Sequence, residues 1–467
     1  MRSGILNFLD DIRSSYWFVP SVMVLMAMIL SFATIQLDTV VAGAAPDWLS
    51  WLFDNQPQGA REVLSTIAGS MITVAGVVFS ITLVAVSNAA YRLSPRLLTN
   101  FMRDVSNQVT LGTFISTFIY CLMVLRAVQS APAGQQGDEA SAFVPHLALL
   151  LAIALAVCSI AVLIYFIHHI PRSIHVSSVV ADIGTDLKNQ LASLFPRELG
   201  APTDAEIGGS NEKAFRERLL AGEAGVIAVP STASGYLRIM DTDDLMEIAE
   251  KKDLEIQLLV QPGEFLNEGD AVMTFRRADG AKPDKALTSK LQETFTLGAM
   301  RTPMQDANFL AQELSEIAMR ALSPGINDPV SAISALNWLG SGLAYLGGRE
   351  SIKPLRKDSK GRDRILSPVI TFESLVENSL VMIAPDFARN LPAARAYLTV
   401  TSRLARGLPT ERRAVIEKLQ TRFKKITGEA LPEKDVEEMF SEPVGGRSAA
   451  LARARNKAQK FLSLFSF

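Results

Sequence analysis

The sequence of 467 residues contains few of the side chains on which most enzymes and metalloproteins rely. It has two cysteines, Cys121 and Cys158, and both lie inside apolar runs. A disulfide framework and a thiolate metal cluster are therefore excluded. Four histidines occur, at positions 146, 168, 169 and 175. Because none follows His175, histidine-based catalysis is excluded in the whole C-terminal part.

A basic charge excess and the common catalytic motifs are also missing. The formal net charge of −2 gives no basic field for phosphate, so we expect no nucleic-acid partner. The chain contains no Walker loop, dinucleotide fingerprint, His-Glu-x-x-His motif or serine elbow. Asp306, Glu313 and Glu316 form an acidic group on one predicted helix, without a second acidic motif at metal spacing. We therefore expect no enzyme, no cofactor and no metal site.

Long apolar runs dominate the N-terminal part. Four runs, at about 18–37, 63–90, 105–128 and 143–167, are each long enough to cross a bilayer as a helix. Lysine and arginine are concentrated before the first run, between the second and third, and after the fourth. By the positive-inside rule, this pattern predicts that both termini are cytoplasmic.

The rest of the chain has the composition of a soluble protein. The expected organisation is a four-span transmembrane domain (1–175), a helical connector (176–222), a small α+β domain (223–288) and a helical domain (289–467). The glycine-rich, charged stretch 346–366 is expected to be an exposed loop or hairpin between helices. The predicted fold class is thus a membrane α-helical protein, with four transmembrane helices followed by a cytoplasmic α+β small domain and a helical domain.

The segment 223–288 alternates short strands with tight turns. It resembles half of a biotinyl or lipoyl barrel, and also the small ligand-binding lobes attached to some potassium channels. No lysine occupies a hairpin tip, which argues against a biotin or lipoyl carrier. A structural linker domain and a ligand-sensing lobe are the alternatives that remain.

Hydroxyl side chains recur at steps of three and four in the second and third runs, so that they share one helix face in each. These residues are Thr66, Ser70, Thr73, Ser80 and Ser87 in the second run and Thr110, Thr113 and Thr117 in the third. Such a face either packs against another helix or lines a water-filled path in an oligomer.

The heptapeptide SPGINDP, from Ser323 to Pro329, predicts a rigid corner between two helices. Its motif residues are Ser323, Pro324, Gly325, Asn327, Asp328 and Pro329. Proline ends the first helix, and Gly325 is expected to supply a positive φ. Asp328 is expected to cap the second helix, with Pro329 at its first position. Leu322, Ile326 and Val330 are expected to pack inside the corner.

The same stretch carries a family resemblance. The segment RALSPGINDP (320–329) resembles the signature of a bacterial family of uncharacterised membrane proteins, domain of unknown function 2254. QPGEFLNEGD (261–270) and LGAMRTPMQDANF (297–309) also fit that family's pattern, although Val330-Ser331 stands where Phe-Thr is expected. The resemblance implies a bacterial inner-membrane protein with an N-terminal helical bundle. The family has no assigned activity, so no functional residue is transferred.

Two functions from different classes fit these features. The leading hypothesis is an oligomeric channel or permeation protein, gated by its cytoplasmic domain. The alternative is a membrane-anchored sensor or scaffold that binds a protein partner. The expected partners are the lipid bilayer, further copies of the chain in a homo-oligomer, and a small ligand or protein on the cytoplasmic body.

Overall fold

The computed structural model describes residues 17–41, 57–92, 104–129, 143–193, 197, 199–203, 209–220, 225–277 and 285–441. Both chain termini lie outside these ranges, so the expected location of the termini is not addressed by them. The chain divides into two compact units, one ending at His175 and the other beginning at Val176. We call them the bundle and the body.

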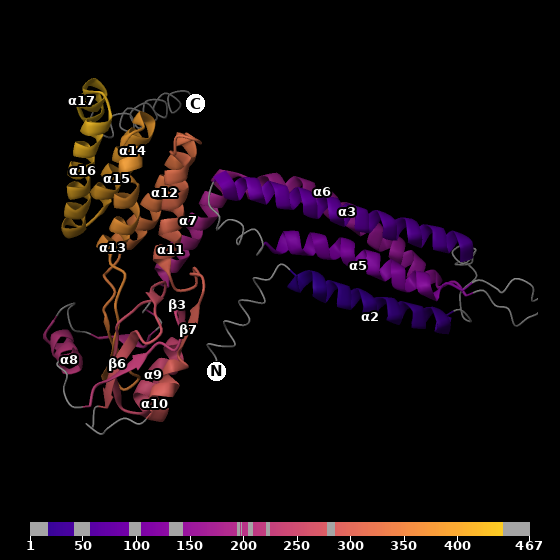
Figure 1. The fold of residues 1–467 in the computed structure, drawn as a ribbon, viewed down its shortest axis with the longest axis horizontal. Coiled ribbons are helices and arrows are strands. Elements are labelled where there is room, and N and C mark those ends of the chain that lie inside the picture. Colours follow the sequence, from indigo (N-terminus) through magenta and orange to yellow (C-terminus); the bar gives the residue numbers. More distant parts are fainter. Residues whose placement is uncertain are drawn as a thin grey trace, which may run out of the picture. The chain divides into compact units, whose positions relative to one another are not determined.

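The described part of the bundle consists of four long helices (Figure 1). They are α2 (Phe18–Val41), α3 (Pro57–Arg92), α5 (Val105–Ala127) and α6 (His146–Ile174). Each contains a stretch long and apolar enough to span a membrane, which confirms the four expected spans. α2, α3 and α6 extend beyond the C-terminal ends of their apolar runs, because the backbone hydrogen bonding continues into the residues that follow.

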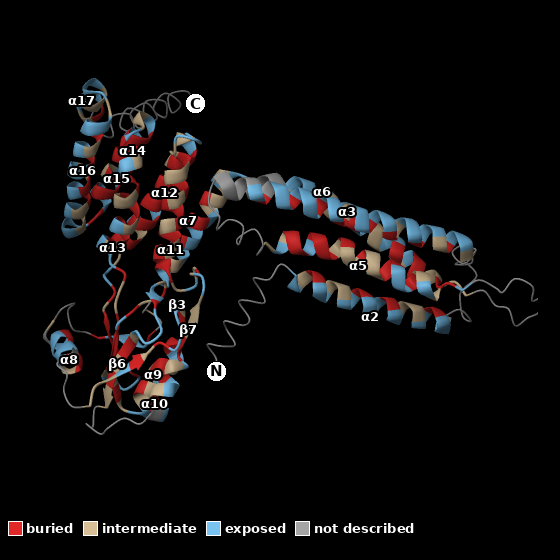
Figure 2. Ribbon diagram, viewed as in Figure 1, coloured by how far each residue is buried: buried red, intermediate tan, exposed pale blue. Residues whose placement is uncertain are grey.

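Helix α5 occupies the centre of the bundle. Half of its apolar stretch is buried (50%), against 17%, 28% and 22% for α2, α3 and α6. Tyr120 and Val124 of α5 pack with Leu64 of α3 and Ala148 of α6. Large apolar side chains are exposed on the outer faces, as expected of helices that have lipid as their solvent. Figure 2 shows much of the bundle ribbon coloured as exposed.

The body contains two antiparallel-rich sheets. The six-stranded sheet has the order β1-β8-β9-β4-β6-β2, and the three-stranded sheet has the order β5-β3-β7. The strands are β1 (Ala201–Pro202), β2 (Ile227–Pro230), β3 (Gly235–Met240), β4 (Leu254–Leu258), β5 (Phe265–Leu266), β6 (Ala271–Arg277), β7 (Phe295–Gly298), β8 (Leu355–Lys357) and β9 (Asp363–Leu366).

Alternation along β4 and β6 gives the six-stranded sheet one largely apolar face. Ile256 and Phe275 face each other in register and are completely buried. Helices α9 (Thr242–Lys251) and α10 (Lys285–Gln292) contribute apolar residues to the same core. A smaller cluster joins α8 (Ser210–Leu220) to β8 and β9.

Strands β8 and β9 arise from the charged stretch 346–366, which was expected to be an exposed loop or hairpin. A hairpin forms and its tip is exposed, but its strands are buried within the sheet. Ile365 pairs in parallel with Ile256 of β4. The strands are buried because apolar residues lie between the charged ones. Pairing in the sheet removes these apolar residues almost completely from solvent, namely Leu355, Ile365 and Leu366. One sheet therefore contains strands from segments on both sides of residue 289.

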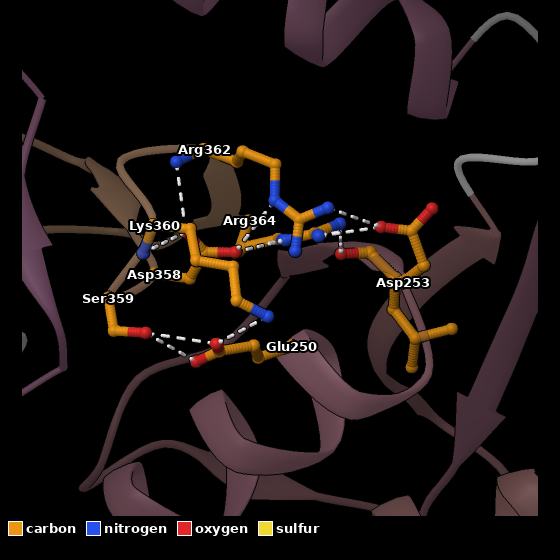
Figure 3. Close-up of polar contacts among 8 residues, drawn as sticks. Glu250, Asp253, Asp358, Ser359, Lys360, Arg362 and Arg364 are labelled. Atoms are coloured by element: carbon orange, nitrogen blue, oxygen red, sulfur yellow. Dashed lines mark hydrogen bonds and ion pairs between the residues drawn. The ribbon is translucent and has the colours of Figure 1, made fainter.

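The charged side chains of this hairpin form ion pairs with one another and with Glu250 and Asp253 (Figure 3). Asp358, whose side chain is inaccessible to solvent, accepts a hydrogen bond from Nε of the buried Arg364 at 2.9 Å. Arg364 also donates to Asp253 at 2.6 Å. Burial by itself raises the pKa of Asp358, but hydrogen bonds from Arg364 and from the N–H groups of Arg362 and Lys360 lower that pKa to about 2.

The remainder of the body is helical. Its helices are α7 (Val176–Ala192), α11 (Ala307–Ala321), α12 (Pro329–Gly347), α13 (Phe372–Val376), the π-helical η2 (Glu377–Val381), α14 (Met382–Ala388), α15 (Leu391–Gly407), α16 (Thr410–Ala430) and α17 (Glu433–Ser441). Their common core includes the stacked rings of Tyr397 and Phe423, 4.1 Å apart.

Helix α7 belongs to this helical core, although the sequence favoured a connector from 176 to 222. It packs against α12 through two reciprocal contacts. Gly184 lies against the ring of Trp338, and Gly342 lies against Leu187; a Cβ at either glycine would collide with that partner. Each helix thus supplies a gap that is filled by a large side chain of the other.

Loss of the Asp358 carboxylate is expected to destabilise the body. Asp358→Asn should lower the free energy of unfolding by about 2–4 kcal/mol at pH 7, because it leaves Arg364 buried with one partner fewer. The difference from wild type should shrink as the pH falls from about 4 towards 2, where the native carboxylate also takes up its proton. Denaturant unfolding in detergent micelles measures both.

The exposed Glu429 of α16 provides the control, since Glu429→Gln removes a solvated charge and should change stability by less than about 0.5 kcal/mol. Equal stability of Asp358→Asn and Glu429→Gln at pH 7 would contradict the assigned role of Asp358.

Candidate functional site

The hydroxyl stripe of α3 lies on the outer face of the bundle. Thr66, Ser70, Thr73, Ser80 and Ser87 are all exposed within the chain. Most buried residues of α3 are instead small or apolar, among them Ala60, Leu64, Ala68, Met71, Ala75 and Val78, although Thr82 is also buried. The stripe therefore takes no part in packing inside one copy of the bundle.

Two hydroxyls of the stripe form hydrogen bonds within their own helix. The hydroxyl of Thr66 donates to the carbonyl of Glu62, and that of Thr73 donates to the carbonyl of Gly69, both at 2.7 Å. Gly69 and Gly76 border the stripe, and a Cβ at either position would meet open space. The result is a shallow, weakly polar surface along an otherwise apolar helix.

The corresponding residues of α5 have different surroundings. Thr110 and Thr117 are buried, and the Thr117 hydroxyl is 3.1 Å from that of Ser159 on α6. Thr113 is half-buried and donates to the carbonyl of Val109 at 2.8 Å. The two stripes that the sequence predicts thus separate: that of α5 packs within the chain, and that of α3 does not.

A buried carboxylate at the end of α2 is a feature that sequence reasoning missed. Asp38 is 5% exposed and accepts hydrogen bonds from the N–H groups of Leu147 and Ala148, both at 2.9 Å. These N–H groups belong to the first turn of α6, which has no intrahelical partners for them. A carboxylate there also complements the helix dipole. In the sequence, Asp38 directly follows the apolar run 18–37, and this position indicates only where the span ends.

The opposite end of α6 is held by a second acidic residue. Nε2 of His169 lies 3.1 Å from Oδ2 of Asp104, and its ring stacks on that of Tyr165. Asp104 also caps α5 by accepting from the N–H of Ser106 at 2.9 Å. Asp38 and Asp104 together fix both ends of α6 against α2 and α5. Within the described ranges, no group of three His, Cys, Asp or Glu side chains is placed to hold a metal ion.

The corner between α11 and α12 forms as a helix–turn–helix, with two differences from expectation. The positive φ of 48° belongs to Asn327, and Gly325 adopts no positive φ. The reason is that the chain reverses just before the cap, where the N–H of Asp328 returns to the carbonyl of Ala321 at 2.6 Å. Asparagine tolerates this left-handed conformation better than other side chains.

Asp328 caps α12 as the sequence predicted. It accepts from the N–H of Ser331 at 3.1 Å and from its hydroxyl at 2.5 Å, and Pro329 occupies the first turn. The hydroxyl of Ser331 lowers the pKa of Asp328. The second difference concerns packing: Val330 is 75% exposed, and Leu322 and Ile326 are only half-buried. The prediction that all three pack inside is wrong for Val330, because the cap turns its side chain away from α11.

The acidic group of α11 is dispersed over different tasks. Asp306 caps α11, and its Oδ2 accepts a hydrogen bond from Nη2 of Arg301 at 2.6 Å. Glu316 forms an ion pair with Arg320 at 3.3 Å. Glu313 is buried. Burial raises the pKa of Asp306 in spite of the positive charge of Arg301. Asp306 thus builds the start of α11 and Glu316 forms an ion pair near its end, so the three residues do not act as one shared site.

Gly263 explains why Asp306 is buried. Its φ of +98° and the close approach of the Asp306 carboxylate leave no room for a side chain at this turn. The turn of QPGEFLNEGD thereby contacts the helix start of LGAMRTPMQDANF. Gln305 adds a paired contact to the N–H and carbonyl of Met240, at 2.8 and 3.0 Å. Two segments that are distant in sequence form one joint between sheet and helices.

Four apolar helices with exposed outer faces, followed by a mixed body, define a multi-pass membrane protein. The chain belongs to the family described as "Predicted membrane protein (DUF2254)", whose model matches residues 13–402. This match confirms the resemblance inferred from RALSPGINDP.

Two similar proteins are the uncharacterized proteins Mb1321c of Mycobacterium bovis and Rv1290c of Mycobacterium tuberculosis. Each is 30% identical to this chain over 419 residues, which are 89% of this chain and 76% of the relative. No solved structure matches the chain.

Removing the Asp38 carboxylate is expected to loosen the bundle. Asp38→Ala should lower stability by about 0.5–2 kcal/mol, as for the loss of a helix cap, and should lower Tm in detergent micelles. The neighbouring Thr39→Ala is the control, because the Thr39 hydroxyl is exposed and donates to the carbonyl of Gln36 in its own helix. Equal Tm values for the two variants would contradict a capping role for Asp38.

Proposed function

We propose that this protein is an oligomeric channel or permeation protein of the bacterial inner membrane, and not an enzyme. Its permeation path would be lined by the outer face of α3 from several copies. The observation that carries this proposal is the exposure of Thr66, Ser70, Thr73, Ser80 and Ser87 on the bundle surface.

The other lipid-exposed faces make the α3 stripe distinctive. α6 presents Ile153, Val157, Ile160 and Ile164 outward, and α2 presents a comparable series of large apolar side chains. On α3, glycines and hydroxyls alternate with such residues. Small residues let helices of different copies approach closely. An oligomer with α3 around its axis would remove the stripe from lipid and leave the apolar faces of α2 and α6 outside.

The chemistry of the stripe suits a neutral, hydrated path. Hydroxyl groups can replace part of the hydration shell of an ion at modest cost, whereas a charged side chain would select strongly by sign. Between Thr66 and Ser87, α3 contains no acidic or basic residue. We therefore expect little discrimination between cations and anions, and no coupling to proton transfer along α3.

Gating by the body is supported by the chain connectivity. A single residue, His175, separates α6 from α7. The reciprocal contacts of Gly184 with Trp338 and of Gly342 with Leu187 lock α7 to α12. A change in the helical core would thus pull directly on the last membrane span. In this proposal the body is cytoplasmic, and its α+β part senses a small ligand or a protein partner.

Leucine in the middle of the stripe is expected to block permeation. Thr73→Leu and Ser80→Leu should each reduce conductance in planar bilayers at least tenfold, because they replace hydroxyls by bulky apolar groups in the middle of the proposed path. Thr73→Ser should conduct like wild type, since it retains the hydroxyl.

Ser65→Leu is the matched control, because Ser65 is an exposed hydroxyl on the same helix but off the stripe. Conduction unchanged by Thr73→Leu would refute the proposed lining. An absence of conductance in wild-type protein under all ionic conditions would favour the alternative, a membrane-anchored sensor or scaffold.

Cysteines on the stripe test the oligomer separately. In a chain carrying Cys121→Ala and Cys158→Ala, Thr73→Cys should form disulfide-linked dimers in membranes on mild oxidation, because copies meet along this face. Ile153→Cys, exposed on α6, should remain monomeric. Similar crosslinking at both positions would indicate random collisions.

A further inference from the structure

We propose that the bundle binds one ordered water molecule between α3 and α5, where the water bridges the hydroxyl of Thr82 and the side-chain oxygen of Asn107. The bundle encloses both residues, whose exposed fractions are 5% and 2%. Oγ1 of Thr82 and Oδ1 of Asn107 are buried, and neither has a hydrogen-bond partner among the residues that the structure describes. The inference does not depend on the protein being a channel.

The relative direction of α3 and α5 is the first step. Nη2 of Arg61, near the start of α3, donates to the carbonyl of Val128, the residue that follows α5, at 2.9 Å. Further along α3, Val78 belongs to the same apolar cluster as Leu111 of α5. Residue numbers therefore rise along α3 as they fall along α5, so the two helices are antiparallel.

This register places the two polar residues at one level of the bundle. From the contact of Arg61 with Val128, Thr82 lies 21 residues onward along α3, and Asn107 lies 21 residues back along α5. Each of these steps covers about 31 Å at the rise of an α-helix. Thr82 and Asn107 are thus level with each other.

Both residues also lie on the faces that the two helices turn towards each other. Thr82 follows Val78 by four residues, and Asn107 precedes Leu111 by four. Residues four apart in a helix are neighbours on one face. Since Val78 and Leu111 pack in a common cluster, the side chains of Thr82 and Asn107 meet one turn further along the same contact.

The hydroxyl of Thr82 is not bonded within its own helix. The hydroxyls of Thr66 and Thr73 in α3, and of Thr110 in α5, each donate to the carbonyl four residues earlier. This bond within the helix is a common one for a threonine. Thr82 forms no such bond with a described residue, and its Oγ1 is buried. The hydroxyl therefore faces the interior of the bundle, where α5 lies.

A bridging water gives both groups the partner that they need. Lipid supplies neither donors nor acceptors, so a polar group buried without a partner destabilises a membrane bundle. The amide oxygen of Asn107 can only accept, whereas the hydroxyl of Thr82 can donate or accept. One water molecule can donate to Asn107 and accept from Thr82 at the same time.

The charges around the site argue against an ion. Nδ2 of Asn107 donates to Oδ2 of Asp104 at 3.4 Å, so the amide oxygen is turned away from that carboxylate. Asn107 lies in the first turn of α5, where the partial positive charge of the backbone N–H groups opposes a cation. The Asp104 carboxylate opposes an anion. Water is neutral, small enough to lie between packed helices, and both a donor and an acceptor.

The water completes a polar network across three helices. Oδ2 of Asp104 lies 3.1 Å from Nε2 of His169 on α6 and 3.4 Å from Nδ2 of Asn107 on α5. The bridge extends this network to Thr82 on α3. The side chains of His169 and Asp104 are 28% and 25% exposed, so the network begins at groups that solvent can reach.

The sign of a stability change tests the proposal on the full chain in detergent micelles. In the background of Cys158→Ala, the remaining thiol is the buried Cys121, and its reaction with a thiol-activated fluorophore on heating reports the Tm of the bundle. Thr82→Val keeps the shape of the side chain and removes the hydroxyl. It should lower Tm by several degrees, because the water and Asn107 lose a bonded partner. If Thr82 has no partner, the same variant should raise Tm.

Thr110→Val is the matched control, because Thr110 is as deeply buried but donates to the carbonyl of Ser106 in its own helix. Its Tm should stay close to that of wild type. Asn107→Leu combined with Thr82→Val should lower Tm by clearly less than the sum of the two single changes, since both remove the same bridge. A Tm that Thr82→Val raises or leaves unchanged, or strictly additive effects, would overturn the proposal.

Thr82→Gln distinguishes a water from a direct contact between the two side chains. Glutamine is larger than threonine by about the volume of one water, ~30 Å³, and its amide supplies the missing donor. It should displace the water and recover most of the Tm that Thr82→Val loses. A Tm as low as that of Thr82→Val would show that no such space exists and would refute a water.

Exchange of sodium chloride for choline chloride tests for a bound cation. At constant ionic strength, the Tm of the wild-type chain should be the same in both salts, because water needs no metal ion. A Tm that rises specifically with sodium, and that loses this dependence in Thr82→Val, would assign the site to a cation and contradict the proposal.

Discussion

The contact between α7 and α12 is the interaction on which the arrangement of the body depends. α7 follows the last membrane helix after one residue, and it enters the helical core through glycines that each accept a large side chain from the other helix. Close packing of this kind fixes register, because a shift by one residue would bring side chains into collision. α12 in turn begins at the corner and ends before the hairpin that completes the six-stranded sheet. A single helix pair thus relates the chain leaving the membrane, the signature motif and the sheet.

Three buried charges, Asp38, Asp306 and Arg364, follow one rule in both units. Each lies where helix N–H groups or an opposite charge compensate for the loss of water. Asp38 accepts from the first turn of α6, and Asp306 caps α11 and meets Arg301. Arg364 lies between Asp358 and Asp253. The hydrogen bonds and ion pairs of these residues therefore hold structural elements together. Acidic residues that resemble a candidate site in the sequence already have structural partners in the fold.

Sequence patterns predicted best where the physical signal is local. Apolar length alone located α2, α3, α5 and α6, and the order of proline and aspartate predicted the cap of α12. Sequence patterns failed to predict burial where burial depends on a partner that is distant in the sequence. The charges of 346–366 predicted an exposed loop or hairpin, and a hairpin forms, but its strands are buried because β9 pairs with β4, a pairing that cannot be read along the chain. Val330 was expected inside the corner, but the direction of its side chain depends on where α12 leaves the turn.

The sequence by itself determined that four helices cross a membrane, that a mixed body follows, and that the chain carries the signature of its family, since each of these depends on composition or on neighbouring residues. Only the tertiary structure decided that the α3 stripe lies outside the bundle while that of α5 lies inside. Both stripes have the same spacing and the same chemistry. Which face of a helix is buried depends on the helices around it, and no periodicity within one helix contains that information.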